Sequence, residues 1–372
     1  MDSNDIERER GITILAKTTS IHYDGYKINI LDTPGHADFG GEVERIMNMV
    51  DGVLLLVDAY EGTMPQTRFV LKKALEAGVK PIVVINKVDK PTARVEKVLD
   101  EVIDLFIELG ATEEQLDFKV AYVSALNGTA SLDPDISTQS ESYDDIFNLI
   151  INEIPEPNAN PDGNLQFQPA LLDYNEYVGR IGIGKVHSGT LKVNEMVSCV
   201  RLDGSIKQFR IQKLFGFDGL KRVEINEAKA GDIAAVAGLM DISVGETICN
   251  VGKEEALPIL RIDEPTLKMT FMVNNSPFVG KEGSIVTARK IGERLFKETQ
   301  KDVSLKVEES GNESWVVSGR GELHLSILIE NLRREGFELQ VSKPEVIIKE
   351  IDGVKCEPYE DVQIEVSDDC VG

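Results

Sequence analysis

Short aliphatic runs that alternate with amphipathic segments constrain this fold more than any other feature of the sequence. The runs at 53–57, 81–85 and 118–123 have the length and apolar character of strands that are buried on both faces. Segments with helical spacing separate these runs, at 65–78 and at 92–109. Strands that alternate with helices predict a mostly parallel sheet with helices on both of its faces.

The stretch 28–39 places polar chemistry directly after another predicted strand. Its aliphatic residues stop at Asp32, and Pro34 and Gly35 then predict a tight turn. Glycine has no Cβ, so the backbone N–H of Gly35 can approach a phosphate closely. Asp32 is well placed to hold a Mg²⁺-bound water, and His36 could orient a water for attack. A surface turn with an incidental histidine is the alternative interpretation of Asp-Thr-Pro-Gly taken alone.

A second motif, after the run 81–85, fits recognition of guanine. The Asp89 carboxylate can accept hydrogen bonds from the ring N–H and the exocyclic amine of guanine, a donor pair that adenine lacks. The stem of Lys87 can lie along the base, and Asn86 can join neighbouring loops. Losing a matched buried hydrogen bond costs about 1–3 kcal/mol, so several together would give strong selectivity. Taken alone, Asn-Lys-x-Asp often only caps a helix.

The guanine interpretation rests on the order of several motifs along the chain. Ser124, Ala125 and Leu126 follow the run 118–123 and could offer a backbone N–H to the guanine carbonyl. All of these motifs lie at strand ends or in the loops beside them: Thr13, the segment after Asp32, the segment after Asn86, and Ser124 to Leu126. Ligands of open α/β sheets bind at the carboxyl ends of the strands. Together the motifs predict a guanine nucleotide site.

Composition excludes several other classes of protein. The 372 residues carry a net charge of −24, which argues against non-specific binding of nucleic acid by the whole molecule. The basic residues within 289–297 and at 333–334 are interpreted as solvated helix faces. Four scattered cysteines without Cys-x-x-Cys spacing are expected to be reduced, as in a cytosol. The sequence has neither an apolar run of about 18 residues nor a signal-peptide pattern.

Changes in pattern along the chain predict four domains. Residues 155–163 are rich in proline and form a predicted linker, and the first ten residues are predicted to be a mobile loop. Short strands with glycine turns after the linker predict a β-barrel, and a strand and helix mixture follows, with a new strand at 362–366. The predicted domains are an α/β domain at 1–157, a β-barrel at 164–257, an α+β domain at 265–345, and the start of another α+β domain at 346–372.

With these motifs in place, the whole chain resembles the translational GTPases. Residues 9–14 are similar to their first switch and residues 32–36 to their second. Residues 178–190 resemble the opening of their second-domain barrel, and residues 319–334 resemble the third domain shared with elongation factor G. Within this superfamily the sequence is most similar to the TypA/BipA family of ribosome-associated GTPases. Between Pro344 and Glu357 there is no room for the tRNA-mimicking domain of a translocase.

The resemblance implies roles for the residues of these motifs. Thr13 would be a Mg²⁺ ligand in the GTP state, and Asp32 would contact the metal through water. Gly35 would donate to the γ-phosphate, and His36 would orient the attacking water once the ribosome positions it. Implied partners are GTP or GDP with Mg²⁺, and the ribosome with its RNA and proteins. The resemblance also implies a cytoplasmic protein with no membrane partner, monomeric off the ribosome, in translation regulation or ribosome assembly under stress.

The sequence departs from the family pattern in one respect. A P-loop, Gly-x-x-x-x-Gly-Lys-Ser/Thr, should precede the first switch, yet only twelve residues precede Thr13. The nearest imitation, residues 179–185, is followed by Val186 and is predicted to be a strand of the barrel. We therefore expect a P-loop-type GTPase domain without its P-loop segment, then a β-barrel and a ferredoxin-like domain, in a chain that is truncated at both ends.

Two other functions remain open from the sequence. GTP hydrolysis by this chain is expected to be impaired, although the parent protein would hydrolyse GTP to GDP and phosphate. The parent could instead be another factor similar to elongation factor G, such as a back-translocating paralogue or a ribosome-protection factor. The chain could also act only as a ribosome-binding module.

Overall fold

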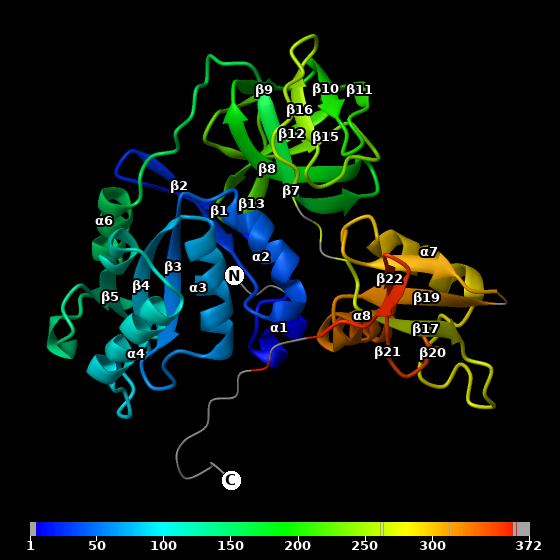
Figure 1. Cartoon of the computed structure of the whole chain (residues 1–372), viewed down its shortest axis with the longest axis horizontal. Helices are drawn as coiled ribbons and strands as arrows, with labels where there is room; N and C mark the ends of the chain where they lie inside the picture. Colours follow the sequence, from blue (N-terminus) through cyan, green and yellow to red (C-terminus); the bar gives the residue numbers. More distant parts are fainter. Residues whose placement is uncertain (1–4, 261, 263, 312, 360–361, 363–372) are drawn as a thin grey trace. The chain divides into compact units, whose positions relative to one another are not determined.

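The computed structural model describes residues 5–260, 262, 264–311, 313–359 and 362 (Figure 1). The chain divides into two compact units, Met1–Ile262 and Asp263–Gly372. This boundary falls between the predicted barrel and the predicted α+β domain.

A four-stranded sheet forms the first part of unit 1, and three of its strands are parallel. The order in space is β3-β4-β5-β6, with β6 antiparallel to β5. The predicted parallel sheet is confirmed, whereas β6 was not predicted. The bounds are β3 Gly52–Asp58, β4 Lys80–Asn86, β5 Lys119–Ser124 and β6 Thr129–Ser131.

Helices cover both faces of this sheet, as the sequence predicts. Leu71 of α3 and Val98 and Phe106 of α4 pack against one face. Ile146 and Leu149 of α6 pack against the other. Both faces of the inner strand β4 are buried, and its sequence is continuously apolar, whereas Leu56 of the edge strand β3 is 60% exposed. The helices are α3 Pro65–Glu76, α4 Val95–Glu108, the short α5 Glu113–Leu116 and α6 Asp144–Glu153.

The register of the parallel strands aligns their carboxyl ends. Asp58, which ends β3, lies opposite Asn86, which ends β4. Asn86 in turn lies opposite Val123 of β5. The loops that follow these three strands therefore leave the sheet along one edge, which we call the base edge, with Asn86, Asp89 and the loop 124–126.

A hairpin of β1 Lys17–Tyr23 and β2 Tyr26–Asp32 precedes this sheet. Asp24 and Gly25 connect the strands with φ values of 46° and 82°, as the mirror-image turns favoured in hairpins require. The predicted hairpin is confirmed. In the described part of the chain its strands do not pair with the β3–β6 sheet, and Lys17 lies opposite Asp32.

The segment before the hairpin differs from its prediction. Residues 1–10 are expected to be a mobile loop, but Asp5–Arg10 form helix α1. Ile6 and Glu7 of this helix are only 1% and 0% exposed. The sequence gives no signal for this helix, because the stretch is charged and has no apolar periodicity. Its buried face includes the carboxylate of Glu7, whose burial depends on partners distant in sequence.

Helix α2, Gly40–Met47, follows the short 3-10 helix η1, Ala37–Phe39, and packs on two sides. Val43 and Met47 contact the buried Ala74 of α3. On another side Ile46 joins a cluster with Ala170 and Ile181 of the next sheet. The segment after Asp32 is therefore connected by its helix to both parts of unit 1.

The second part of unit 1 is an antiparallel sheet of eight strands, ordered β11-β10-β16-β7-β8-β15-β12-β13, with a separate pair β14-β9. The sheet curls around a core that includes Phe167, Val197 and Val236 (Figure 1). Residues 179–185 lie in β8, as predicted. The bounds are β7 Gln166–Asn175, β8 Gly179–Ser188, β9 Thr190–Lys192, β10 Met196–Val200, β11 Ile206–Arg210, β12 Lys213–Asp218, β13 Lys221–Glu224, β14 Glu227–Lys229, β15 Ile233–Ala237 and β16 Thr247–Asn250.

Unit 2 is a five-stranded antiparallel sheet with two helices. The spatial order is β18-β19-β17-β20, and β21 also pairs with β17. Trp315 and Phe271 of the sheet share a core with Ile291 of α7 and Leu325 of α8. The bounds are β17 Leu267–Val273, α7 Ala288–Glu298, β18 Lys306–Glu309, β19 Ser314–Gly319, α8 Glu322–Arg334, β20 Leu339–Val341 and β21 Glu345–Val346.

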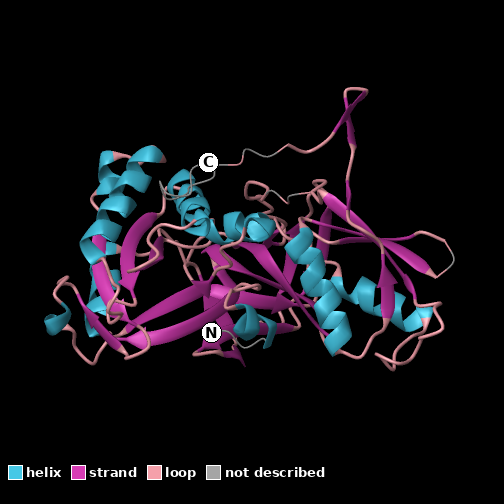
Figure 2. Cartoon of the chain, turned by 90° about the horizontal axis from the view of Figure 1, so that it is seen from below, coloured by secondary structure: helices cyan, strands magenta, loops and turns pink. Residues whose placement is uncertain are grey.

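A small hairpin follows this sheet. Strands β22 Lys349–Ile351 and β23 Val354–Cys356 pair with each other and extend from unit 2 as a thin ribbon (Figure 2). The predicted start of a further α+β domain covers this hairpin. The predicted strand at 362–366 lies, apart from its first residue, outside the described residues.

Candidate functional site

Asn86 joins two loops of the base edge through one side-chain atom. Its Oδ1 accepts the N–H of Lys87 at 2.8 Å and the N–H of Ala125 at 3.1 Å. Because these donors belong to the loops after β4 and β5, one amide sets the spacing between them. The N–H of Ala125 is thereby engaged within the protein, whereas the described residues record no partner for the N–H of Leu126. The side chain of Leu126 is 90% exposed.

Lys87 is held by a residue that the sequence reasoning missed. It has a φ of 65°, and its Nζ lies 2.6 Å from Oδ2 of Asp58 at the end of β3. Oδ1 of Asp58 accepts the N–H groups of Tyr60 and Glu61 at 2.8 and 3.2 Å. Asp58 is the polar residue that ends an aliphatic strand, as Asn86 is, and this signal could have identified it.

The pKa values of the two partners shift in complementary directions. Burial alone would raise the pKa of Asp58, but the hydrogen bond from Lys87 and the two N–H donors outweigh it and lower that pKa well below its usual value. The hydrogen bond to Asp58 raises the pKa of Lys87. Both groups are therefore charged at neutral pH, and they fix the backbone on either side of the base edge.

Asp89 differs from Asp58 and Asn86 because, among the described residues, its side chain has no recorded hydrogen-bond or ion-pair partner. The residue is partly exposed one turn after β4. For the described residues, the structure records neither a hydrogen bond nor an ion pair of the Asp89 side chain. A carboxylate that is placed by a rigid loop but not neutralised can accept hydrogen bonds from a ligand.

The segment after Asp32, which we call the switch turn (residues 33–36), is held by few contacts. Residues 33–35 have no regular structure, and Oγ1 of Thr33 donates to Leu31 O at 3.2 Å. Gly35 does not have a left-handed φ, and a Cβ built there would meet only the Gln66 side chain, at 3.4 Å. The predicted tight turn at Pro34 and Gly35 is absent, because the chain bends at His36 instead.

His36 is the N-cap residue of the 3-10 helix η1, and its side chain is 39% exposed. Its Nδ1 accepts the N–H of Asp38 at 3.2 Å, so the neutral ring carries its proton on Nε2. The ring also meets the edge of Phe39, with centroids 6.4 Å apart. The imidazole is thus oriented locally, and its Nε2–H can donate to a water.

Thr13 lies in the loop that enters β1, at the end of the hairpin where Asp32 closes β2. The sequence reasoning missed how this loop is held. The buried carboxylate of Glu7 accepts the N–H groups of Ile14 and Leu15 at 3.0 and 3.2 Å. No sequence signal identifies Glu7, because it resembles its exposed neighbours in a charged stretch.

The predicted site residues therefore form two groups. Asn86, Lys87, Asp89 and the loop 124–126 meet at the base edge of the parallel sheet. Thr13, Asp32 and the switch turn with Gly35 and His36 gather at one end of the hairpin, which is a separate sheet. Within the residues that the structure describes, no group of three or more His, Cys, Asp or Glu side chains is arranged to hold a metal ion.

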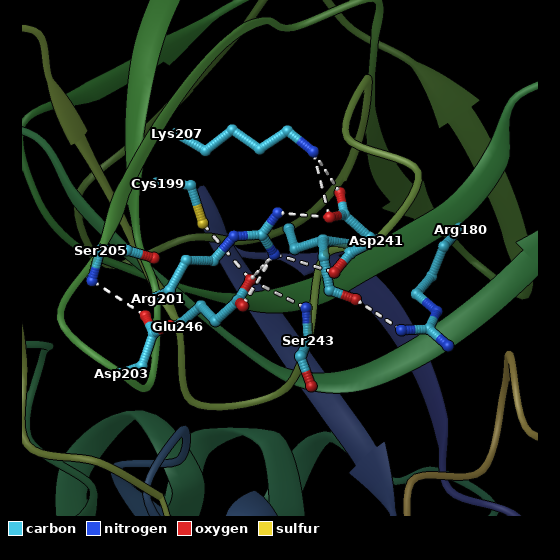
Figure 3. Close-up of polar contacts among 10 residues, drawn as sticks. Arg180, Cys199, Arg201, Asp203, Ser205, Lys207, Asp241, Ser243 and Glu246 are labelled. Carbon is cyan, nitrogen blue, oxygen red and sulfur yellow. Dashed lines mark hydrogen bonds and ion pairs between the residues drawn. The ribbon is translucent and has the colours of Figure 1, made fainter.

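A second polar cluster lies in the eight-stranded sheet (Figure 3). Arg201 contacts Glu246 and Asp241, each at 2.8 Å, and Lys207 pairs with Asp241 at 3.0 Å. Cys199 donates to Glu246 at 3.3 Å. Burial and the charge of Glu246 raise the pKa of the Cys199 thiol above its ordinary value, so the thiol stays protonated. Two cations balance two carboxylates here, and we assign the cluster to structure.

The cysteines agree with the expected reduced state as far as they are described. Cys199 and Cys249 are buried free thiols, and Cys356 is also free. Cys370 lies outside the described residues. None of the helices in the described ranges has both the length and the apolar character that crossing a membrane requires.

Comparison with known proteins matches the two parts of unit 1 separately. The elongation factor Tu GTP binding domain matches residues 1–156, and elongation factor Tu domain 2 matches residues 179–249. The parallel sheet and its base edge thus lie in the region matched by the GTP binding domain, and most of the β-rich part that follows lies in the region matched by domain 2.

Similarity to individual relatives extends over the entire chain. The chain is 68% identical over 373 residues to the large ribosomal subunit assembly factor BipA of Bacillus subtilis (strain 168). It is 55% identical over 369 residues to the protein of the same name from Escherichia coli (strain K12). The protein of this name from Synechocystis is 52% identical over 375 residues. The chain belongs to the TypA/BipA family. The matches cover 99–100% of the chain but only 60–62% of each relative, so the chain spans about three fifths of their length.

Proposed function

We propose that this chain is part of an enzyme that binds GTP and hydrolyses it to GDP and phosphate. The observation that carries the proposal is the base edge, where Asn86 joins two loops and the Asp89 carboxylate stands open beside them. An acceptor-only group at this place suits the two N–H donors of guanine. The N–H of Leu126, rather than the engaged N–H of Ala125, is the available donor for the guanine carbonyl.

The other group of residues suits the phosphate end of the nucleotide. The Thr13 hydroxyl and the Asp32 carboxylate are oxygen ligands, and Mg²⁺ is commonly held by one or two protein oxygens together with substrate phosphates. When bound, the ion would neutralise charge on the phosphates. Gly35 offers its backbone N–H to the γ-phosphate without a side chain in the way. His36 donates from Nε2 and would thereby orient the attacking water.

For the whole protein we propose a role on the ribosome. The relatives are named as large ribosomal subunit assembly factors, which favours ribosomal RNA and proteins as partners and a cytoplasmic location. The order β17-α7-β18-β19-α8-β20 supports a ferredoxin-like assignment for unit 2. We further propose a monomer off the ribosome.

A chimaera tests the proposed activity. In it, the matched region of the Bacillus subtilis relative is replaced by this chain, so that the product has the full length of the relative. We expect it to bind GTP much more tightly than ATP in isothermal titration and to hydrolyse GTP faster when ribosomes are added. Equal affinity for GTP and ATP would contradict the proposed base recognition.

The variant Asp89→Asn in the chimaera tests the base edge itself. Loss of the double acceptor should lower GTP affinity by about a hundredfold and shift preference toward XTP, whose base has a carbonyl in place of the exocyclic amine. Asp104→Asn, an exposed aspartate of α4, is the matched control and should leave both affinities unchanged. If Asp89→Asn keeps a strong preference for GTP over XTP, Asp89 does not read the base.

A further inference from the structure

The segment that carries Thr13 is held by carboxylates from two different helices. Glu7 of α1, which is 0% exposed, accepts the N–H groups of Ile14 and Leu15 on Oε1. Glu42, in the first turn of α2, accepts the next N–H, that of Ala16, at 3.4 Å. Three successive backbone N–H groups therefore end on side chains that lie seven or more positions away in the sequence.

The first of these bonds acts directly on Thr13. The N–H of Ile14 belongs to the same rigid peptide group as the carbonyl of Thr13, so fixing one orients the other. Ile14 is itself only 2% exposed, which anchors the following residue in the interior. The position of Thr13 is thus set by groups that cannot touch a nucleotide themselves.

A buried carboxylate needs compensation, and Glu7 has it. Its Oε2 lies 2.5 Å from Nζ of Lys17, the first residue of β1. Burial would raise the pKa of Glu7, but the hydrogen bonds from Lys17 and from the two backbone N–H groups outweigh it, and the pKa is lowered. The side chain is therefore ionised at neutral pH, and its hydrogen bonds are the stronger, charge-assisted kind.

We propose that Glu7 is a positioning residue that fixes the peptide between Thr13 and Ile14, and that Glu42 couples the same segment to α2. Helix α2 begins four residues after His36, so the Thr13 loop and the switch turn are linked through the protein before any nucleotide is present. This inference rests on the proposed function, because Thr13 matters to catalysis only as a ligand of Mg²⁺.

Hydrogen exchange on the 372-residue chain tests whether Glu7 holds the segment. In Glu7→Ala, exchange at the Ile14 and Leu15 amides should rise at least about tenfold, which corresponds to about 1.4 kcal/mol. Glu7→Gln keeps an acceptor but loses the pair with Lys17, and it should give a smaller rise. Asp5→Asn, at an exposed carboxylate of the same helix, is the control. Exchange in the core of the eight-stranded sheet should not change, which shows that the variants are folded.

Nucleotide binding by the chimaera separates positioning from general stability. Glu7→Ala should weaken a non-hydrolysable GTP analogue at least about tenfold and leave GDP within about threefold, because the family resemblance assigns Thr13 a contact only in the GTP state. Equal weakening of both nucleotides, or unchanged exchange at Ile14 and Leu15, would overturn the proposal. If the unaltered chimaera binds neither nucleotide, the proposed function fails, and the exchange experiment still decides whether Glu7 holds the segment.

Discussion

The base edge and the switch turn contain equally suggestive motifs, but the protein holds them very differently. At the base edge, Asn86 Oδ1 accepts two backbone N–H groups, and Lys87 is paired with Asp58 at 2.6 Å. In the switch turn, residues 33–35 have no regular structure, and the contacts of the His36 ring are local, with Asp38 and Phe39. Long-range hydrogen bonds and an ion pair thus hold the side chains of the base edge in place. The side chains of the switch turn are held mainly by contacts with residues close to them in sequence.

The difference teaches which part of a nucleotide each region can recognise without help. Recognition of a flat, neutral base requires a few groups in a fixed arrangement, and preorganised loops supply that. Catalysis at a phosphate requires charge stabilisation and closure that assemble only with the ligand or a partner. We therefore expect changes at the base edge to affect folding and selectivity, and changes at the switch turn to affect hydrolysis alone.

The largest expected effect is the difference in GTP affinity between the 372-residue chain and the chimaera, because the short chain lacks the P-loop contacts to the phosphates. The 372-residue chain contains no P-loop pattern, so it should bind GTP at least about a thousandfold more weakly than the chimaera. Charge-assisted hydrogen bonds contribute about 1.5–3 kcal/mol each, and several would be missing. Isothermal titration with GTP and Mg²⁺ on both proteins measures this. Sub-micromolar affinity of the short chain would show that the base edge and switch turn suffice.

The next effect concerns His36. In the chimaera, His36→Ala should lower ribosome-stimulated GTP hydrolysis by about 10²–10³ and leave GTP affinity within about threefold, because the imidazole contacts the water and not the base. Single-turnover hydrolysis with ribosomes measures it. His22→Ala, an exposed histidine of β1, is the control. Hydrolysis by His36→Ala within about threefold of the unaltered chimaera would remove His36 from the mechanism.

A pair of substitutions compares the two regions by stability. Asn86→Ala should lower the unfolding free energy of unit 1 by about 0.5–1.5 kcal/mol, because the two hydrogen bonds that join the loops after β4 and β5 are lost. Gly35→Ala should change it by less than about 0.5 kcal/mol, since neither its φ nor its surroundings require glycine.

Urea unfolding of the 372-residue chain measures both substitutions. Far-UV circular dichroism reports unit 1 together with unit 2. Trp315, the only tryptophan of the sequence, reports unit 2 alone and should be unaffected. Equal losses from Asn86→Ala and Gly35→Ala would contradict the contrast between the two regions.

The smallest expected effect is the pH dependence of the base edge. Asp58 has a lowered pKa, so its stabilisation is present above its ordinary pKa of about 4 and is lost as the pH falls further. Lys87 has a raised pKa, so its share is present below about 10.5 and is lost as the pH rises further. Asp58→Asn should cost on the order of 1 kcal/mol at pH 7 and flatten the acid limb of the stability curve. An unchanged acid limb would show that Asp58 does not contribute.

The sequence by itself determined the alternation of strands and helices from β3 to β5 and the polar residues at the ends of those strands. Aliphatic runs mark β3, β4 and β5 as strands, and the signature is clearest in β4, whose five central residues are all buried. Asn86 and Ser124 are predicted because polar residues directly after such runs lie at the carboxyl edge of a parallel sheet, and Asp89 is predicted because it completes the Asn-Lys-x-Asp pattern.

Only the tertiary structure decided how those residues are held. Helix α1 and the burial of Glu7 have no local signature, because a charge can be buried only when distant groups, here Ile14, Leu15 and Lys17, compensate it. Likewise, the position of β5 beside β4 decides that the N–H of Ala125 is hydrogen-bonded to Asn86, while the Asp89 carboxylate has no recorded partner among the described residues. Periodicity predicts which residues are buried, but only the fold decides which residues far apart in the sequence become partners. These long-range partners hold the base edge in place, whereas the switch turn has few of them.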